Sequence, residues 1–333
     1  MEQNTDYLRK PTPEEHFILH GEAAETRLES LSQDGLITPT ERFFVRNHSA
    51  TPCIDIETWR LTIEGPGVTR RLQLDYADLL ARPARTVTRF LECAGNGRAY
   101  FDLVLGKPAE GSQWLCGGYG VAEWTGVPLA DLLEEAGLKP TAVDVMACGL
   151  DAVRMGRPVP VAKALMEDTL LVHTMNGAPL EPDHGFPARL LVPSWIGGAS
   201  IKWVGAIEVS EQPRFVHWNT RDYILEGPDH PPQPPAEGEI LTTTLVKSTV
   251  ALPWPARLRA GRQEITGYAW SPFGRIARVD VSLDEGATFQ PVERVAPNLA
   301  AAGSRWRCHL SLPPGEHTIT VCATDEHGNS QYD

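Results

Sequence analysis

The sequence predicts an α+β protein in two domains, and three observations lead to this fold class. The chain has 333 residues, which corresponds to about two domains at the usual size of roughly 150 residues. It contains 29 glycines and 28 prolines, a content that favours turns and short strands over a helical bundle. A proline-rich run from Gly227 to Pro235 is typical of an extended, semi-rigid connector. We therefore expect one domain over residues 1–230 and a second over residues 231–333.

Strand and helix signals alternate irregularly in the first part of the chain. Strand-like runs cover residues 59–63, 87–92, 188–192 and 201–209. The clearest helix spans 128–137, where Pro128 stands in the first turn, apolar residues from Leu129 to Ala136 share one face, and Gly137 ends the pattern. This irregular order favours α+β over a doubly wound sheet. Neither a dinucleotide-binding glycine motif nor a P-loop motif occurs, so a nucleotide site has no support.

The second part of the chain shows the two-residue period of half-buried strands. Val279, Val281 and Leu283 alternate with polar residues, and the same period runs from Trp306 to Leu312. Turn sequences at 284–286 and 313–315 follow these runs. Strands and turns at this spacing over about 95 residues predict a β-sandwich of immunoglobulin type, although the Cys…Trp…Cys signature of antibody domains is absent.

Charge and hydropathy exclude several classes of protein. The net charge of −13 would repel a phosphate backbone, so we expect no nucleic-acid partner. No window reaches the roughly 20 apolar residues that cross a bilayer, so we expect no membrane partner. The first 20 residues show no secretory signal and the last five no targeting signal. These features predict a cytoplasmic protein.

The segment from Arg89 to Arg98 is the most suggestive for chemistry. Cys93 follows a strand, and a glycine turn and Arg98 come next, so positive charge and exposed N–H groups would stabilise its thiolate. It is a candidate nucleophile or soft metal ligand. A buried structural cysteine is an equally good interpretation of this segment alone. The six cysteines form no CxxC pair, which argues against disulfides, zinc and covalent haem.

Two further segments offer polar groups. Arg46, Asn47 and His48 form a set of donors for an oxyanion or a polar heterocycle, with a solvated loop end as the alternative. Residues 183–189 and 195–203 contain a Gly-Gly pair followed by serine and lysine, which could hold a phosphate, although the spacing matches no nucleotide motif.

Taken together, these segments resemble the sulfite oxidase family of molybdenum enzymes. The matching pieces occur in the family's order and span most of the chain. They are FFVRNH (43–48), ECAGNGR (92–98), WTGVPL (124–129), GLD (149–151), MNGAPLEPDHGFPARLLVP (175–193), SIKW (200–203) and HWNTRDY (217–223).

The resemblance implies a Mo-molybdopterin (pyranopterin dithiolene) cofactor with Cys93 as the protein sulfur on the metal. It implies oxidation of sulfite to sulfate by oxygen-atom transfer, and a homodimer formed through the second domain. The cofactor would contact Phe44, Val45, Arg46, Asn47, His48, Asp151, His184, Arg189, Ser200, Ile201 and Lys202.

The resemblance also implies an anion pocket. Its members would be Arg46, Arg98, Trp114, Tyr223 and, on the second domain, Arg307 on the face opposite Trp306. Such a pocket is needed because sulfite approaches a protein of net charge −13, so local arginines must reverse the field. Tyr223 would donate a hydrogen bond near the reacting group, and Trp114 would form a wall of the pocket.

The chain departs from the family pattern at several points. Gly97 stands where animal and plant members often have the first of two arginines. No cytochrome b5-like segment precedes residue 43 and no flavin domain follows residue 333, so we expect no haem, no flavin, and an external acceptor such as a cytochrome, a quinone or oxygen. The family usually continues with another strand after Asn329, so we expect either a shortened sandwich domain or a truncated chain.

Three alternatives share these features. A related sulfur-compound dehydrogenase, for example one acting on sulfane sulfur, and a nitrate or sulfoxide reductase would use the same fold. A catalytically inactive β-sandwich interaction protein is the third.

Overall fold

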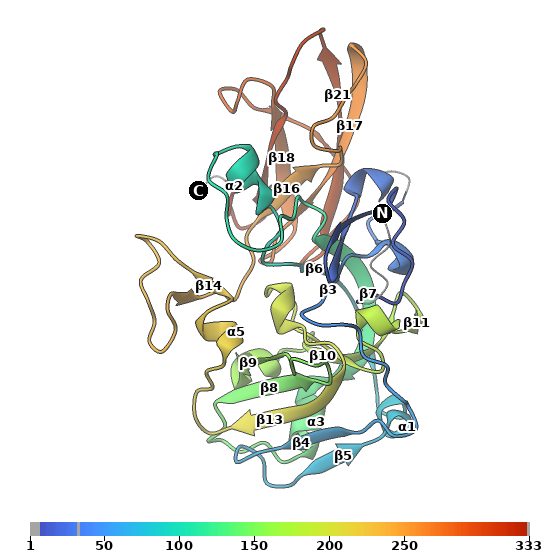
Figure 1. Ribbon diagram of the computed structural model, residues 1–333, viewed down its shortest axis with the longest axis vertical. Coiled ribbons are helices and arrows are strands. Elements are labelled where there is room, and N and C mark those ends of the chain that lie inside the picture. Colours follow the sequence, from blue (N-terminus) through green and yellow to red (C-terminus); the bar gives the residue numbers. More distant parts are fainter. Residues whose placement is uncertain (1–6, 32–33, 332–333) are drawn as a thin grey trace.

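The computed structural model describes residues 7–31 and 34–331 and divides them into a mixed lower part and an upper β-sandwich (Figure 1). The α+β class predicted for the first part is confirmed. Its small first sheet has the order β1 (Phe17–His20), β2 (Ala23–Thr26), β3 (Val45–Arg46). Two 3-10 turns, η1 (Leu28–Leu31) and η2 (Thr40–Arg42), lie between β2 and β3.

Two larger sheets carry most of the first part. One has the order β11 (Ala178–Pro179), β10 (Leu170–Met175), β7 (Tyr119–Pro128), β6 (Arg85–Glu92), with β12 (Arg189–Leu191) also paired to β10. The other has the order β5 (Leu72–Leu74), β4 (Leu61–Glu64), β13 (Val204–Ser210), β8 (Asp144–Gly149), β9 (Gly156–Pro160). Only the β4–β13 pair of this second sheet is parallel, which excludes a doubly wound arrangement.

Short helices connect the strands. They are α1 (Tyr76–Leu80), α2 (Ala99–Leu103), α3 (Leu129–Glu135), α4 (Val161–Ala164) and α5 (His217–Thr220), with the 3-10 turns η3 (Pro182–His184) and η4 (Gly197–Ala199). The predicted helix over 128–137 is α3, with Pro128 one position earlier than expected, at the N-cap. Its apolar face, with Leu129, Leu132 and Leu133 fully buried, packs into the main core. None of the helices in the described ranges is long and apolar enough to cross a membrane.

The predicted strand over 201–209 begins later than expected. β13 starts at Val204 because Trp203 adopts a φ of 54°, which a continuous strand does not allow. Ser200, Ile201 and Lys202 therefore lie in an irregular turn before the strand. This turn delivers them to the pocket described below.

The proline-rich run forms the tip of a hairpin instead of a direct connector. β14 (Ile224–Leu225) and β15 (Glu239–Ile240) pair antiparallel, and the exposed run projects between them (Figure 1). The predicted boundary between residues 230 and 231 falls inside this hairpin. The division into domains over 1–230 and 231–333 stays a prediction.

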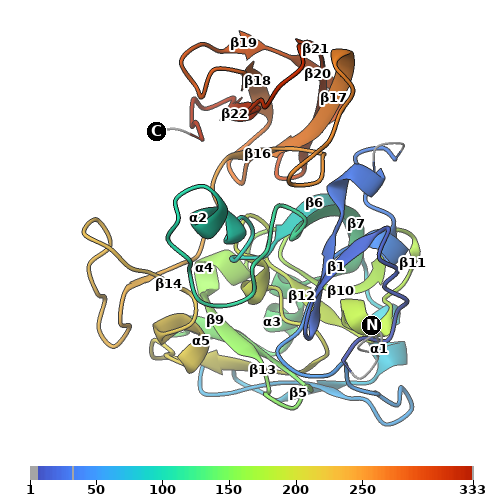
Figure 2. The same cartoon turned by 45° about the horizontal axis from the view of Figure 1, so that its top comes forward.

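The second part is the predicted immunoglobulin-like β-sandwich (Figure 2). One sheet has the order β16 (Lys247–Val250), β17 (Gly261–Trp270), β21 (Gly303–Leu312), β20 (Glu293–Leu299). The other has the order β19 (Gln290–Pro291), β18 (Ile276–Ser282), β22 (Thr320–Asp325). The predicted alternation holds, since Val279, Val281 and Trp306 are buried between the sheets.

A shared apolar cluster joins the sandwich to the first part. Phe90, Tyr119 and Val121 of β6 and β7 pack with Tyr268 and Trp270 of β17. The rings of Tyr119 and Trp270 are stacked, with centroids 4.0 Å apart. Burial of aromatic area is the main attraction in such a contact. The sandwich is therefore packed against β6 and β7, and β6 ends directly before Cys93.

Candidate active site

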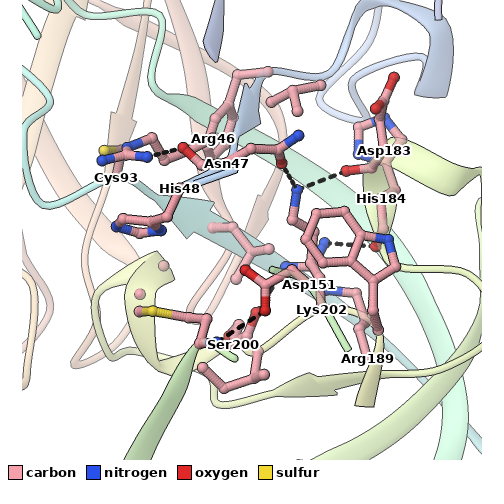
Figure 3. A pocket seen from close by; sticks show the side chains of 18 of the residues that line it. Arg46, Asn47, His48, Cys93, Asp151, Asp183, His184, Arg189, Ser200 and Lys202 are labelled. Carbon is pink, nitrogen blue, oxygen red and sulfur yellow. Dashed lines mark hydrogen bonds between the residues drawn. The ribbon is translucent and has the colours of Figure 1, made fainter. Parts of the chain in front are cut away.

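A deep pocket opens between β3, the end of β6, η3, η4 and the turn before β13 (Figure 3). Thirteen of the residues expected at a site line it, although they come from segments far apart in the chain. They are Phe44, Val45, Arg46, Asn47, His48, Cys93, Asp151, His184, Arg189, Ser200, Ile201, Lys202 and Tyr223.

Cys93 lies at one side of the pocket, in the turn that follows β6. Its N–H donates to the carbonyl of Gly118 over 2.8 Å, and its carbonyl accepts from Asn96 N–H over 2.9 Å. Gly97 completes the turn with a φ of 95°, a conformation that favours glycine and that an arginine at this position would adopt only with strain. Burial raises the pKa of the Cys93 thiol. A thiolate here therefore requires a strong local positive charge, such as a bound metal supplies.

The opposite side of the pocket holds buried cations. Arg189 donates to the carbonyls of His184 and Ser200 over 3.0 and 3.2 Å, and Lys202 donates to the carbonyl of Asp183 over 2.8 Å and to the Asn47 side chain. Burial lowers the pKa of Arg189 to about 9 and lowers that of Lys202 well below its usual value. Both cations donate only to neutral oxygens, so their positive charge is compensated only in part.

Among the described residues no carboxylate forms an ion pair with Arg189 or Lys202, although the charges of Asp183 and Asp151 act on Lys202. Asp183 accepts from the N–H groups of Arg9 and Lys10 over 2.8 and 2.7 Å and from the Thr51 hydroxyl. Asp151 accepts from Met155 N–H over 2.8 Å. The Nε of Arg189 also finds no hydrogen-bond partner among the described residues. Because an unpaired buried donor is costly, this arrangement fits an anionic ligand that supplies the missing acceptor.

His184 lies among these cations. Its Nε2 is 3.2 Å from both the Thr40 carbonyl and the Lys10 Nζ. Burial, followed by the charges of Lys10 and Lys202, lowers the pKa of His184 well below its usual value, so the imidazole is neutral. Lys10 belongs to the N-terminal segment, and no motif in the sequence around it indicated that it reaches the pocket.

A second histidine links the pocket to Tyr223. The hydroxyl of Tyr223 and Nε2 of His48 are 3.0 Å apart and share a hydrogen bond. Burial and the charges of Arg46 and Lys202 lower the pKa of His48 to about 3, and burial raises that of Tyr223 to about 12. Both groups are therefore neutral at physiological pH.

Arg157 stands behind Tyr223 and is a residue that sequence reasoning missed. Its side chain is fully buried, its guanidinium carbon lies 5.5 Å from the Tyr223 ring centroid, and it donates to the carbonyls of Trp218 (2.8 Å) and Leu241. Burial lowers its pKa to about 10. In the sequence nothing distinguishes this arginine of β9 as a site residue. Its position behind Tyr223 becomes visible only in the structure.

Three of the expected anion-pocket residues, Arg98, Trp114 and Arg307, do not line the pocket. Arg98 lies beyond the Cys93 turn and donates to the Ser112 carbonyl over 3.2 Å, although its charge still acts on the Cys93 thiol. Trp114 is buried with Phe44 and Cys93 in an adjoining apolar cluster. The pocket itself therefore contains Arg46 and Tyr223 from the predicted anion set.

The placement of Arg307 has to be corrected. It lies on the outer face of β21, opposite Trp306 as expected, but this face points away from the pocket. Its guanidinium pairs with Glu293 over 2.8 Å and remains about half exposed. It lines a separate cavity in the sandwich together with Glu264 and His309. The outward direction of alternate β21 side chains thus removes Arg307 from the anion pocket of its own chain.

Two family models match this chain. Residues 48–218 match the oxidoreductase molybdopterin binding domain, and residues 240–331 match the Mo-co oxidoreductase dimerisation domain.

Similar proteins include known enzymes. Human mitochondrial sulfite oxidase is 35% identical over 327 residues, which cover 91% of this chain and 58% of that protein. Sulfite oxidase of Gallus gallus is 35% identical, with 91% of this chain and 70% of that protein covered. Nitrate reductase [NADH] of Ulva prolifera is 33% identical, and the match covers 90% of this chain and 38% of that protein. The chain thus spans little more than half the length of the mammalian relatives.

A solved structure has the same overall arrangement. The crystal structure of the sulfane dehydrogenase SoxCD from Paracoccus pantotrophus superposes with a TM-score of 0.82 and 32% sequence identity. The match covers 98% of this chain and 80% of that one.

Proposed function

Because this chain belongs to the sulfite oxidase family of molybdopterin-binding oxidoreductases, we propose that it oxidises sulfite to sulfate. In the overall reaction, sulfite and water give sulfate, two protons and two electrons, and the electrons pass to an external acceptor. The observation that carries the proposal is the pocket itself, in which a soft sulfur ligand lies opposite two buried cations, one with an unpartnered Nε.

The residues of this pocket fit the cofactor that the family binds. Cys93 would ligate molybdenum through its sulfur, which is a soft ligand. Arg189 and Lys202 would hold the negatively charged phosphate end, and His184, which is neutral, would contribute a ring nitrogen beside them. When bound, the cofactor supplies oxygen-atom transfer and accepts two electrons.

The remaining groups are suited to bind the anion. Arg46 lines the pocket, and its side chain is about one quarter exposed, so it can meet an incoming anion. Its partner Glu22 is 3.8 Å away and is itself partly exposed, so this ion pair compensates little of the Arg46 charge. Tyr223, neutral and hydrogen-bonded to His48, would donate to a sulfite oxygen. Arg98 would add a favourable field from behind the Cys93 turn.

A second candidate substrate is a sulfane sulfur group. The structural likeness to the sulfane dehydrogenase SoxCD covers nearly the whole chain and supports this alternative. The inactive interaction protein considered above is set aside, because the family consists of oxidoreductases.

The direct test is sulfite-dependent reduction of an artificial electron acceptor by purified protein whose molybdenum content is measured on the same sample. Turnover that scales with molybdenum content is the expected result. Molybdenum-loaded protein that is inactive with sulfite but oxidises a sulfane-containing substrate would replace sulfite by the second candidate. Protein that binds no molybdenum when produced in a host that makes the cofactor would contradict the cofactor assignment.

A further inference from the structure

Glu92, the last residue of β6, precedes Cys93 and is 1% exposed. Both of its carboxylate oxygens are engaged. Oε1 accepts from Lys247 Nζ over 2.7 Å and from Asn96 Nδ2 over 3.1 Å, and Oε2 accepts from Trp270 Nε1 over 2.9 Å. We call these four side chains the Glu92 network.

Two members of the Glu92 network come from the sandwich. Lys247 begins β16 and Trp270 ends β17, and they are directly opposite each other in the antiparallel ladder. Figure 2 shows β16 at the base of the sandwich, facing the first part of the chain. One cross-strand pair of the second domain therefore donates hydrogen bonds to the residue next to Cys93.

The Glu92 network extends into the turn that carries Cys93. Asn96 donates to Glu92, and its Oδ1 accepts from Gly118 N–H over 3.0 Å. Lys247 Nζ also lies 3.4 Å from the Asn96 carbonyl. Glu92, which precedes the turn, and Asn96, which lies within it, thus both contact Lys247 of the sandwich.

The charges of the Glu92 network are balanced. A lone buried carboxylate beside the metal-binding sulfur would make the local electrostatic potential more negative. It would therefore favour the more oxidised state of a metal. The ammonium of Lys247, in contact with that carboxylate, offsets this effect. Nothing in this balance depends on the substrate, because the Glu92 network lies behind the turn and does not line the pocket.

We propose that Lys247 and Trp270 are positioning residues, through which the second domain fixes the Cys93 turn, and that Lys247 offsets the charge of Glu92 and so sets the reduction potential of the metal. This inference rests on the proposed function in one respect, namely that Cys93 binds the metal.

The first test is the reduction potential of the molybdenum centre, followed by electron paramagnetic resonance during a redox titration. Glu92→Gln removes a negative charge and should shift the potential upward, and Lys247→Met removes a positive charge and should shift it downward. The double variant should return toward the wild type. Tyr119→Phe is the control, because it removes only a neutral interdomain hydrogen bond, 3.0 Å long, to the Ala302 carbonyl. Single variants that shift the potential in the same direction, or not at all, would overturn the electrostatic part.

The second test needs no metal and no activity. Hydrogen exchange of the backbone amides at residues 93–98 and 118 should be faster in the Glu92→Gln/Lys247→Met double variant than in the wild type and in Tyr119→Phe. The double variant leaves no buried charge unpaired, so it should fold even where a single variant does not. Unchanged exchange would refute the positioning role. Absence of molybdenum from the wild type as well as from every variant, with faster exchange in the double variant, would refute the proposed function and leave the positioning role supported.

Discussion

Burial, more than the neighbouring sequence, determines the protonation state of the Cys93 thiol. The sequence places an arginine five positions later, which by itself favours a thiolate, yet desolvation dominates and raises the pKa of the thiol. A thiol in this state is a poor free nucleophile. This favours the metal-ligand interpretation over the nucleophile interpretation that the sequence left open.

Cys93→Ser should abolish turnover and leave the fold nearly intact. The substitution replaces a soft ligand by a hard one of similar size, so the protein's sulfur bond to the metal is lost and packing changes little. Turnover and the midpoint of thermal unfolding measure the two effects, and molybdenum content shows whether the cofactor is still bound. Full turnover in this variant would remove Cys93 from the metal site.

The two arginines near Cys93 should differ in their effect on substrate binding. Arg46 lines the pocket and Arg98 does not. Arg46→Gln removes a charge-assisted contact worth about 1.5–3 kcal/mol, so the KM for the anion should rise about 10- to 100-fold. Arg98→Gln serves as the matched comparison and should raise the KM less, through the field alone. A larger effect at Arg98 would show that it enters the pocket in the presence of substrate.

The pKa of His48 predicts a pH dependence of stability. In the folded chain this pKa is about 3, below the ordinary 6.5, so between these values the unfolded chain binds a proton that the folded chain does not. The free energy of unfolding contributed by His48 is present above pH 6.5 and is lost as the pH falls toward 3. Below pH 6.5 the wild type should lose up to about 1.4 kcal/mol per pH unit more than His48→Gln. Urea unfolding of both proteins at several pH values measures the difference, and parallel curves would contradict the prediction.

At the scale of elements, the site combines residues of short strands, such as Arg46 of β3 and Arg189 of β12, with residues of irregular segments. Ser200 and Lys202 lie in the turn that delays β13, and Cys93 lies just past β6. The N-terminal segment is fastened to the same region, because Lys10 donates to the carbonyls of Thr40 and Phe43. Loops fixed by such long-range bonds can hold a ligand without large movement.

Lys10→Met should destabilise the protein by about 1–3 kcal/mol, because it leaves the Phe43 carbonyl without its donor. Arg9→Met is the matched control, since the Arg9 side chain is exposed and the contact to Asp183 is made by its backbone N–H. Urea unfolding at neutral pH compares the two. An equal loss of stability in both variants would show that the hydrogen bonds of the Lys10 side chain do not stabilise the fold.

At the scale of the whole molecule, the pocket reverses the sign of the overall charge. The chain carries a net charge of −13, yet Arg46, Arg189 and Lys202 meet in one cavity. The local field therefore attracts a small anion, while the remaining surface keeps the molecule negatively charged.

The second family model leads us to expect a homodimer. Light scattering coupled to size-exclusion chromatography should give twice the mass of one chain over a range of protein concentrations. A mass of one chain at all concentrations would show that the dimerisation domain does not associate in this protein.

The local patterns of the sequence determined the fold class, α3, the alternation in the sandwich and the residues of the motifs, because periodicity and turn chemistry involve neighbours along the chain. The boundaries were less certain: β13 starts three residues late, and the proline-rich run forms a hairpin tip. Only the tertiary structure decided that Lys10, Arg157 and Lys247 reach the site or its support and that Arg307 does not. Each of these outcomes depends on how strands far apart in the sequence pack against one another, which no local pattern specifies.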